Sequence, residues 1–239
     1  MAKQSKGGFK VPVYKCRFCE KEYKREETVA THKCLKRDRY NDRESRQMRE
    51  AYRLYVEFMN FHHLSIKKSE EPLMAFIKSK YFNDFYDFAE YILANDILNK
   101  DKFITEILTS GKPVYEWRTH RTLEEWVLKN IRDEHPRRAI ERSIMALDEW
   151  GTATGNDWWT FFENASTERA IMWLEMGKIS PWLIYVAAPE SGNKLLNRFS
   201  DSELSYVIKF IDPTHFQIKQ IHYQKEVNEL RTLLTEFNL

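Results

Sequence analysis

The sequence predicts a mainly α protein, with a small unit of two strands and one helix near the N-terminus and an all-α domain of about ten helices after it. Three observations predict this fold class. Apolar residues recur at helical spacing between Gly, Pro and capping residues over most of residues 64–239. Patterns typical of strands are scarce beyond the N-terminal region. All three cysteines lie close together in that region, beside a histidine.

The cysteine-rich stretch has the spacing Cys16-x2-Cys19-x12-His32-x-Cys34. Three thiolates and one imidazole within so short a segment form a ligand set that tetrahedral Zn²⁺ takes. A disulfide framework would call for an even number of cysteines. We therefore predict one structural zinc ion, held by these four residues. Four protein ligands close the site, which leaves no coordination position for a catalytic water.

Residues 12–36 resemble the C2H2 zinc fingers. The first three ligands have the separations of that family, and three apolar residues stand where the family places its small core, at Tyr14, Tyr23 and Val29. The resemblance implies a ββα fold. The last ligand departs from the family pattern, because Cys34 follows His32 by two residues instead of four or more. Two such helical positions differ by about 200° around the axis, so we predict a C2HC variant whose helix ends or tightens at His32.

The resemblance also implies which residues would contact bases. In C2H2 fingers these residues lie just before the helix and at its second, third and sixth positions, here Arg25, Glu27, Thr28 and Thr31. Arg25 would make the bidentate contact to guanine. One finger covers only about three base pairs, and a lone finger also serves as a protein-docking module. Both interpretations stay open at this point.

Charge is distributed unevenly along the chain. Residues 1–53 carry sixteen Lys and Arg against eight Asp and Glu, which leaves a balance of −6 for the rest of a chain whose net charge is +2. We predict a flexible basic tail over residues 1–11 that contacts an anionic partner, while the acidic body contacts a different partner. An ordinary solvated basic surface is the alternative.

A basic linker helix is predicted over residues 37–63, helical from about Asn41 or Asp42, which are possible N-caps. Met48, Tyr52, Tyr55 and Met59 recur on one side of it and would pack on the body. The arginines fall on the other side and would contact phosphates next to the finger, at Arg39, Arg43, Arg46, Arg49 and Arg53. As the alternative, these arginines pair with Glu44 and Glu50 along an exposed helix.

The body, residues 64–239, is predicted as a train of short helices. Breakers and caps delimit helices at 70–80, 83–95, 102–110, 122–134, 136–150, 166–176, 181–188, 201–212 and a final helix near the C-terminus. Thr122 and Asp201 are the expected caps of two of them, and Pro136 opens another. Residues 112–117 are predicted to be extended and 151–155 to form a break. Residues 216–221 are the remaining candidate for a strand.

No pattern in the body indicates catalysis. Adjacent aromatics at Trp158, Trp159, Phe161 and Phe162 are predicted to be core rather than a base-stacking platform, as are Trp173 and Trp182. The sequence lacks a phosphate-cradling glycine loop and a nucleophile-elbow motif. We predict a protein that is not an enzyme, although a nuclease built from scattered carboxylates would leave no signature. No apolar run has the length of a membrane span.

These features lead to one hypothesis and one alternative. The hypothesis is a non-enzymatic zinc-finger protein that binds nucleic acid, with DNA favoured over RNA, and whose helical body docks a protein partner. The alternative is an interaction or assembly module in which the finger is a protein clip. The order of parts and the neighbourhoods of residues 179–182 and 211–213 resemble uncharacterised proteins of large tailed bacteriophages. That resemblance implies no activity, and it implies a location in the cytoplasm of an infected bacterium.

Overall fold

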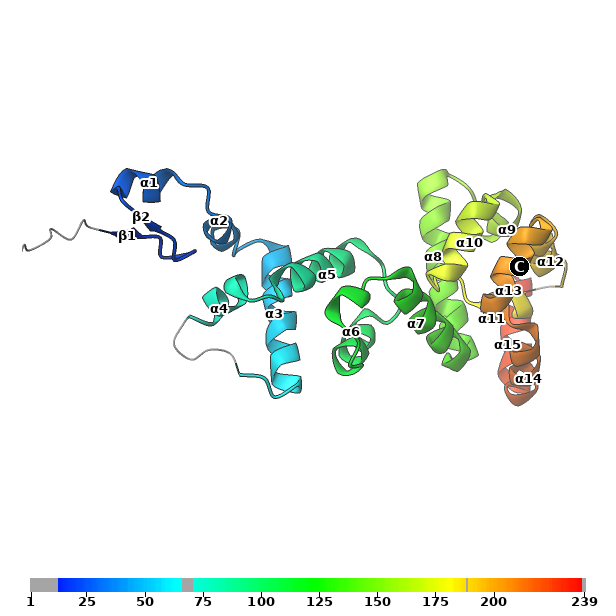
Figure 1. Cartoon of the computed structure of the whole chain (residues 1–239). Coiled ribbons are helices and arrows are strands. Elements are labelled where there is room, and N and C mark those ends of the chain that lie inside the picture. The colour runs from blue at the N-terminus through cyan, green and yellow to red at the C-terminus, as the bar shows by residue number, and fades with distance from the viewer. Residues whose placement is uncertain (1–12, 66–70, 188, 238–239) are drawn as a thin grey trace, which may run out of the picture. The chain divides into compact units, whose positions relative to one another are not determined.

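The computed structural model describes residues 13–65, 71–187 and 189–237, and these residues are mainly helical (Figure 1). The predicted mainly α fold, with a short hairpin near the N-terminus, is confirmed. The predicted basic tail over residues 1–11 lies outside the described residues.

Contacts between residues divide the chain into two compact units. The N-terminal unit comprises Met1–Ala94 and Leu108–Tyr115, and the C-terminal unit comprises Asn95–Ile107 and Glu116–Leu239. All four predicted metal ligands belong to the N-terminal unit.

The N-terminal unit begins with the predicted hairpin and helix. Strand β1 (Tyr14–Lys15) pairs antiparallel with β2 (Glu22–Tyr23), and α1 (Glu26–Thr31) follows. The other helices of this unit are α2 (Leu35–Asn41), α3 (Arg46–Phe61), α4 (Pro72–Lys78) and α5 (Phe82–Ala94). A hairpin whose strands have two residues each and a helix of six residues are both too short to be stable alone in water. Their stability must come from tertiary contacts or from a bound ion.

The predicted start of the basic helix near Asn41 or Asp42 is wrong. One helix, α2, ends at Asn41, and a second, α3, begins at Arg46. Ser45 is the N-cap of α3, because its hydroxyl accepts a hydrogen bond from the backbone N–H of Met48 at 3.1 Å. The sequence prediction missed α2 because its start depends on the extended backbone of Cys34, which is set by the ligand cluster.

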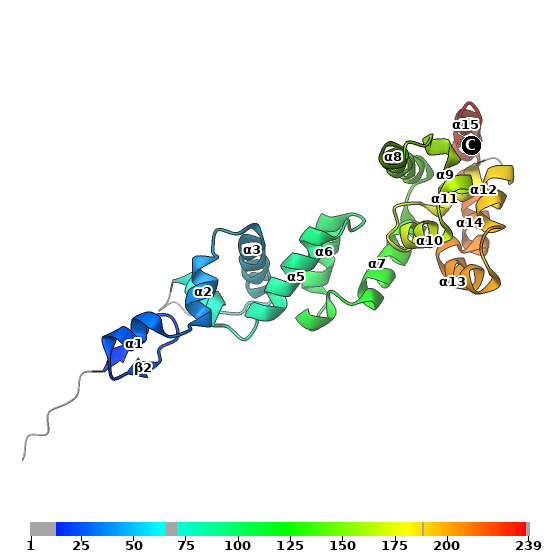
Figure 2. The same cartoon turned by 90° about the horizontal axis from the view of Figure 1, so that it is seen from above.

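Aromatic side chains form the core of the N-terminal unit. Helices α3 and α5 lie side by side in both views (Figures 1 and 2), and α4 packs against both. The ring of Tyr55 on α3 lies 4.9 Å from Phe76 of α4 and 5.8 Å from Phe85 of α5, measured between ring centres. Phe76 and Phe85 are fully buried. Such ring pairs contribute stability beyond their buried area, so this part of the unit has a core of its own.

After α5 the chain is helical almost throughout. The elements are α6 (Lys100–Thr109), the 3₁₀ turn η1 (Val114–Glu116), α7 (His120–Asp133), α8 (Pro136–Thr154), the 3₁₀ turn η2 (Trp158–Thr160), α9 (Phe161–Asn164), α10 (Thr167–Glu175), α11 (Pro181–Val186), α12 (Pro189–Leu196), α13 (Asp201–Ile211), α14 (Pro213–His222) and α15 (Gln224–Thr235). Helix α11 packs against α8, α12, α14 and α15, so it forms the centre of the C-terminal unit.

Several local predictions in this region are wrong. Residues 216–221 belong to helix α14, because Pro213 opens that helix and the Asp212 carboxylate accepts a hydrogen bond from the N–H of His215. The caps of α7 and α13 are Thr119 and Ser200 instead of Thr122 and Asp201. Ser200 and Glu203 form a reciprocal capping box, which fixes the start of α13 one residue earlier.

Two further segments differ from the prediction. The stretch 112–117 contains the 3₁₀ turn η1 instead of being extended throughout. Helix α8 continues through Gly151, and the break comes at Gly155, whose φ of 72° closes the helix in the left-handed conformation. A Cβ on Gly151 would lie 2.7 Å from the carbonyl oxygen of Asn156, so glycine there permits close packing within a helix.

The prediction that the aromatic cluster belongs to the core is confirmed for those of its residues that are buried. Phe161, Phe162 and Trp182 are at most 1% exposed, and Trp173 is buried as well. Trp158 and Trp159 are half-buried and pack against the same core.

Candidate metal centre

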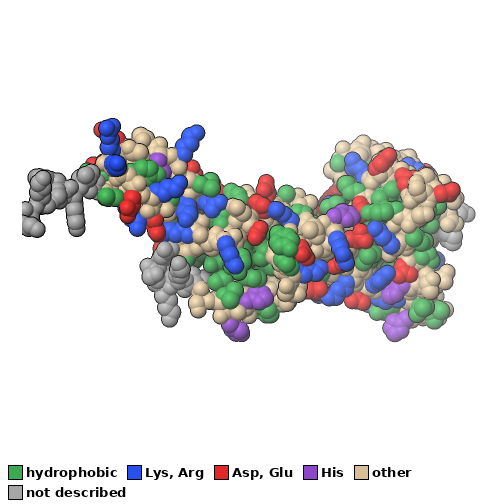
Figure 3. All heavy atoms as spheres, in the orientation of Figure 1, with side chains coloured by type: hydrophobic (Ala, Val, Ile, Leu, Met, Phe, Trp, Pro, Cys, Tyr) green, Lys and Arg blue, Asp and Glu red, His purple; other side chains and the backbone are tan. Residues whose placement is uncertain are grey.

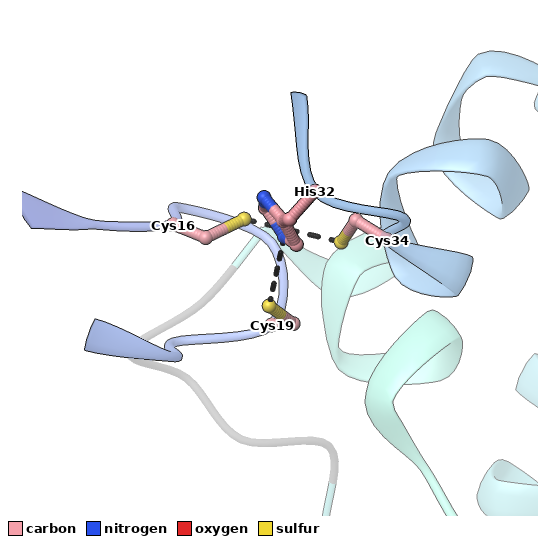
Figure 4. Close-up of side chains that lie close together, drawn as sticks. All are labelled: Cys16, Cys19, His32 and Cys34. Atoms are coloured by element: carbon pink, nitrogen blue, oxygen red, sulfur yellow. Dashed lines mark hydrogen bonds between the residues drawn. The ribbon is translucent and has the colours of Figure 1, made fainter. Parts of the chain in front are cut away.

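The hairpin positions the first two cysteines. Beyond the strands, the N–H of Cys16 donates to the carbonyl of Lys21 at 3.0 Å, and the N–H of Glu20 donates to the carbonyl of Cys16 at 2.8 Å. These two bonds close a tight turn that turns the side chain of Cys19 toward that of Cys16 (Figure 4). Glu20 has a φ of 63°, the left-handed conformation that such a turn requires. The turn between the first two ligands therefore places Cys16 and Cys19 on the same side of the hairpin end.

The end of α1 positions the other two ligands. The helix stops at Thr31, and His32 has an extended backbone with φ −64° and ψ 144°. Cys34 is also extended, and it is the N-cap residue of α2. The prediction that the helix ends at His32, so that the chain carries Cys34 back, is confirmed. The ligand atoms of Cys16, Cys19, His32 and Cys34 all lie within 4.8 Å of one another (Figure 4).

Two separations within the cluster fit a tetrahedral ion. The sulfurs of Cys16 and Cys34 are 3.9 Å apart, and the sulfur of Cys19 is 3.5 Å from Nε2 of His32. A tetrahedron with metal–sulfur bonds of about 2.3 Å and a metal–nitrogen bond of about 2.0 Å has edges of about 3.8 Å and about 3.5 Å. A disulfide would bring two sulfurs to about 2.05 Å, and all three cysteines are free. These four residues could therefore bind one metal ion.

A second hydrogen bond selects the tautomer of His32. Its Nδ1 lies 2.6 Å from the carbonyl oxygen of Val29, which can only accept, so Nδ1 carries the proton. Nε2 is then left with its lone pair directed toward the sulfur of Cys19. Histidine ligands of metal ions are commonly oriented by such a bond from the other ring nitrogen. The ring of Tyr23 packs on His32 at 4.9 Å between centres and restricts it further.

The protein environment favours a thiolate at one position more than at another. Burial raises the pKa of the Cys16 thiol, but hydrogen bonds from the backbone N–H groups of Cys19 and Phe18 outweigh burial and bring that pKa to about 6. Burial holds the pKa of Cys34 above its usual value. The surroundings therefore favour the thiolate form more at Cys16 than at Cys34.

Arg37 supports the truncated end of α1, a role the sequence did not reveal. Its two terminal nitrogens donate to the carbonyl of Ala30 at 2.9 Å and to the carbonyl of His32 at 3.1 Å. Helix ends leave carbonyls without intrahelical partners, and a cation there also complements the helix dipole. Arg37 therefore fixes the backbone on which His32 sits. No local pattern indicates this, because the donor lies in the next helix.

We expect Arg37→Ala to weaken the affinity for Zn²⁺ by roughly tenfold, since loss of groups that orient ligands has effects of this size. Competition with a chromophoric chelator measures the affinity. Lys33→Ala is the matched control, because Lys33 is exposed and has no hydrogen bond or ion pair through its side chain in the described part of the chain. Equal affinities for the two variants would show that Arg37 does not position the ligands.

The metal cluster is joined to the helices that follow it. Its small core of Cys16, Phe18 and Cys34 extends to Tyr40 of α2 and Met74 of α4. The rings of Phe18 and Tyr40 are 5.4 Å apart between centres. The hairpin and α1 are therefore not an independent module, because the core around the metal ligands is shared with α2 and α4.

Polar contacts strengthen the same junction. Nζ of Lys78 lies 2.7 Å from a carboxylate oxygen of Glu20, and this neighbour lowers the pKa of Glu20. Arg39 donates to the carbonyl of Ile77 at 3.3 Å and to the side-chain oxygen of Asn83 at 2.7 Å. Its guanidinium also lies 3.9 Å from the ring centre of Phe82, and burial lowers its pKa. Arg39 is thus occupied by contacts within the protein.

The predicted base-contacting residues occupy the positions the resemblance implies. Arg25 directly precedes α1 and is its N-cap residue, while Glu27, Thr28 and Thr31 lie on the helix, and all four are exposed. The hydroxyl of Thr31 donates to the carbonyl of Glu27 at 2.8 Å.

The remaining arginines of the predicted linker helix divide into two groups. Arg43 lies 3.5 Å from Glu44 in the turn between α2 and α3, and Arg53 on α3 pairs with Glu50 and Glu57 at 2.6 Å each. The alternative interpretation, pairing along an exposed helix, therefore holds for Arg53. Arg46 and Arg49 are exposed and form no ion pair with any described residue.

Among the residues that the structure describes, the four ligands are the only group of three or more His, Cys, Asp and Glu side chains with ligand atoms this close. None of the helices in the described ranges combines the length and apolar character that crossing a membrane requires. Comparisons with protein-family models, with curated proteins and with solved structures found no match for this chain. The cluster, with its short hairpin and following helix, is compatible with a C2HC zinc finger.

Proposed function

We propose that the ion is Zn²⁺ and that it is structural. Three thiolates and one imidazole are soft and borderline ligands that suit zinc, and the two measured separations fit its bond lengths. All four positions of a tetrahedral ion are taken by protein groups, so the ion stabilises the fold instead of activating water. When bound, zinc supplies the stability that the short hairpin and α1 lack.

We further propose that the N-terminal unit binds nucleic acid through its phosphate backbone, with DNA favoured over RNA. The observation that carries this proposal is a set of exposed cations near the metal cluster and on α3 that form no ion pair within the described residues. They are Lys15, Arg17, Lys21, Lys24, Arg25, Lys33, Arg46 and Arg49. Figure 3 shows several Lys and Arg side chains on the viewed face of the N-terminal elements, with acidic groups between them.

Phosphate contacts give affinity, whereas base contacts give specificity. Arg25, exposed and placed directly before α1, is the residue best suited to reach guanine in a major groove, which favours DNA. Thr28 and Thr31 accept several bases. A single such unit reads only a short site, so we propose modest sequence preference.

We propose that the acidic C-terminal unit docks a protein partner. Residues 95–107 and 116–239 of this unit carry 17 Lys and Arg against 22 Asp and Glu, a net charge of −5. The unit also exposes several large apolar side chains, Met145, Met172, Ile208, Ile218 and Ile221. The competing function, a protein clip at the zinc finger, has its own support. Leu35 is 65% exposed and Val13 is 59% exposed, both beside the metal cluster, and apolar side chains there suit a protein contact.

The test is a salt titration of binding by the full chain to duplex DNA, duplex RNA and single strands. Each phosphate neutralised adds about 0.9 to the slope of log K against log salt for duplex DNA. We therefore expect Arg46→Gln with Arg49→Gln to reduce the slope by about 2. Arg53→Gln is the matched control on the same helix, because Arg53 is already paired with two glutamates. Affinity that does not change with salt would exclude this function and favour the protein clip.

A further inference from the structure

A pocket of about 420 Å³ lies in the N-terminal unit, away from the metal cluster. Its walls come from the C-terminal half of α3, the turn between α4 and α5, the first turn of α5 and the segment 111–115. His62 also lines the pocket, and its Nε2 donates to the carbonyl of Leu108 at 3.1 Å, just before the segment 111–115. The volume is within the range of pockets that take small molecules, about 300–1,000 Å³.

Aromatic rings form much of this pocket. Phe58, Tyr81 and Tyr115 line it together with Val114. Tyr81 is held in place, because its ring lies 5.9 Å from that of Phe58 and 6.4 Å from that of Phe85, measured between centres. Tyr115 is 59% exposed, so it presents an aromatic face that the protein leaves open. A fixed ring and an exposed ring on one pocket suit a flat aromatic ligand, which can stack on them.

The polar groups of the pocket carry both signs of charge. Lys80 and Lys112 line it, and Nζ of Lys80 lies 4.9 Å from the ring centre of Tyr81. Asp84 also lines it, half-buried in the first turn of α5, and its carboxylate has no hydrogen bond or ion pair with any described residue. A half-buried carboxylate without a donor favours a ligand that brings one.

We propose that this pocket binds a nucleoside monophosphate unit whose base carries an exocyclic amino group. The base would stack on Tyr81 and Tyr115, the phosphate would pair with Lys80, and the amino group would donate to Asp84. Adenine, guanine and cytosine present such a donor. Thymine has no exocyclic amino group, and its ring N3–H lies between two carbonyl oxygens that a carboxylate repels. A purely apolar ligand would leave the half-buried Asp84 carboxylate without a hydrogen-bond donor.

The test is equilibrium dialysis of the full chain with dAMP, dGMP, dCMP and dTMP, and with adenosine and inorganic phosphate as the two halves of the ligand. We expect saturable binding of the first three, at least tenfold weaker binding of dTMP, and weaker binding of either half. The oligonucleotide (dA)₆ identifies the source. Tighter binding of (dA)₆ than of dAMP indicates an unpaired base in a strand, and equal binding indicates a free nucleotide.

Variants distinguish binding of the nucleotide in the pocket from nonspecific electrostatic binding to the protein surface. Tyr115→Ala should weaken dAMP binding by about tenfold or more, because one stacking ring is lost. The control is Phe61→Ala, an exposed aromatic of the same unit that does not line the pocket. Asp84→Asn should raise dTMP binding relative to dAMP, since an amide can donate to the thymine carbonyl.

Two results would overturn the proposal. One is that inorganic phosphate displaces dAMP as well as dAMP itself does, and the other is that Tyr115→Ala and Phe61→Ala bind dAMP equally. Duplex binding through Arg46 and Arg49 is measured separately, so either proposal can fail without the other.

Discussion

Removing the metal ion with a chelator is expected to unfold β1, β2 and α1. These elements bury almost no apolar surface apart from the core around Cys16, Phe18 and Cys34. Structural zinc contributes about 10–16 kcal/mol of apparent binding free energy to comparable units, far more than so small a core can supply. Without the ion, three cysteines and His32 lose the interaction that holds them together, and α1 is too short to persist.

The effect should extend beyond the ligands, because the core around the cluster is shared. Cys34 is the N-cap residue of α2, Met74 of α4 packs on the cluster, and Lys78 pairs with Glu20. We therefore expect amide hydrogen exchange to accelerate strongly in residues 14–34, and to a smaller extent in α2 and α4. The aromatic core of α3 and α5 should remain protected, since its contacts involve none of the ligands.

Hydrogen exchange followed by mass spectrometry measures this gradient directly. The C-terminal unit is the internal control, and α11 in particular should exchange at the same rate with and without chelator. Adding Zn²⁺ back should restore protection. Unchanged exchange in residues 14–34 after complete removal of the ion would mean that metal binding does not hold this unit together.

What could be predicted from the sequence at this site is what depends on covalent spacing. The ligand set follows from the separations of Cys16, Cys19, His32 and Cys34, and the end of α1 follows from helix geometry, since His32 and Cys34 cannot share a helix face. Arg37 and Arg39 could not be assigned this way. Their partners are carbonyls and an amide reached only once α1, α2, α4 and α5 have packed.

The helices also differ in how far local sequence alone predicts them. Helices opened by proline, such as α8 and α11, were predicted at their first residue, because proline restricts φ and needs no hydrogen-bond donor there. Residues 216–221 were the remaining candidate for a strand and are helical in the structure. Pro213 and the cap at Asp212 start this helix, and Phe216 then packs against Trp182 at 5.2 Å between ring centres. The prediction gave too little weight to this start signal.

The nucleotide pocket shows why function is harder to predict than fold. Its rings and charges come from segments that lie far apart in the sequence, Phe58 on α3, Tyr81 and Asp84 around the start of α5, and Tyr115 at η1. No spacing rule connects them. None of these residues belongs to a sequence motif, whereas the metal ligands lie within nineteen consecutive residues, 16–34.

Trp182→Ala is expected to destabilise the C-terminal unit by about 3–5 kcal/mol, the usual cost of removing a large buried aromatic side chain. Trp182 is fully buried on α11, at the centre of the unit. Its ring makes edge contacts with Phe216 and Tyr223, and its Nε1 donates to the carbonyl of Glu134 at 3.1 Å. Alanine would leave a cavity and an unpaired carbonyl, both of which reduce the free energy of unfolding.

Two variants separate the contributions. Trp182→Phe keeps an aromatic ring and loses the hydrogen bond, so it should cost about 1–2 kcal/mol. Met145→Ala is the control at an exposed apolar residue of the same unit and should stay within about 0.5 kcal/mol of the parent protein. Urea unfolding, followed through hydrogen exchange of α11–α15, measures all three. If the Trp182→Ala protein were as stable as the Met145→Ala protein, α11 would not be the centre of the core. A cavity in a close-packed interior lowers the free energy of unfolding.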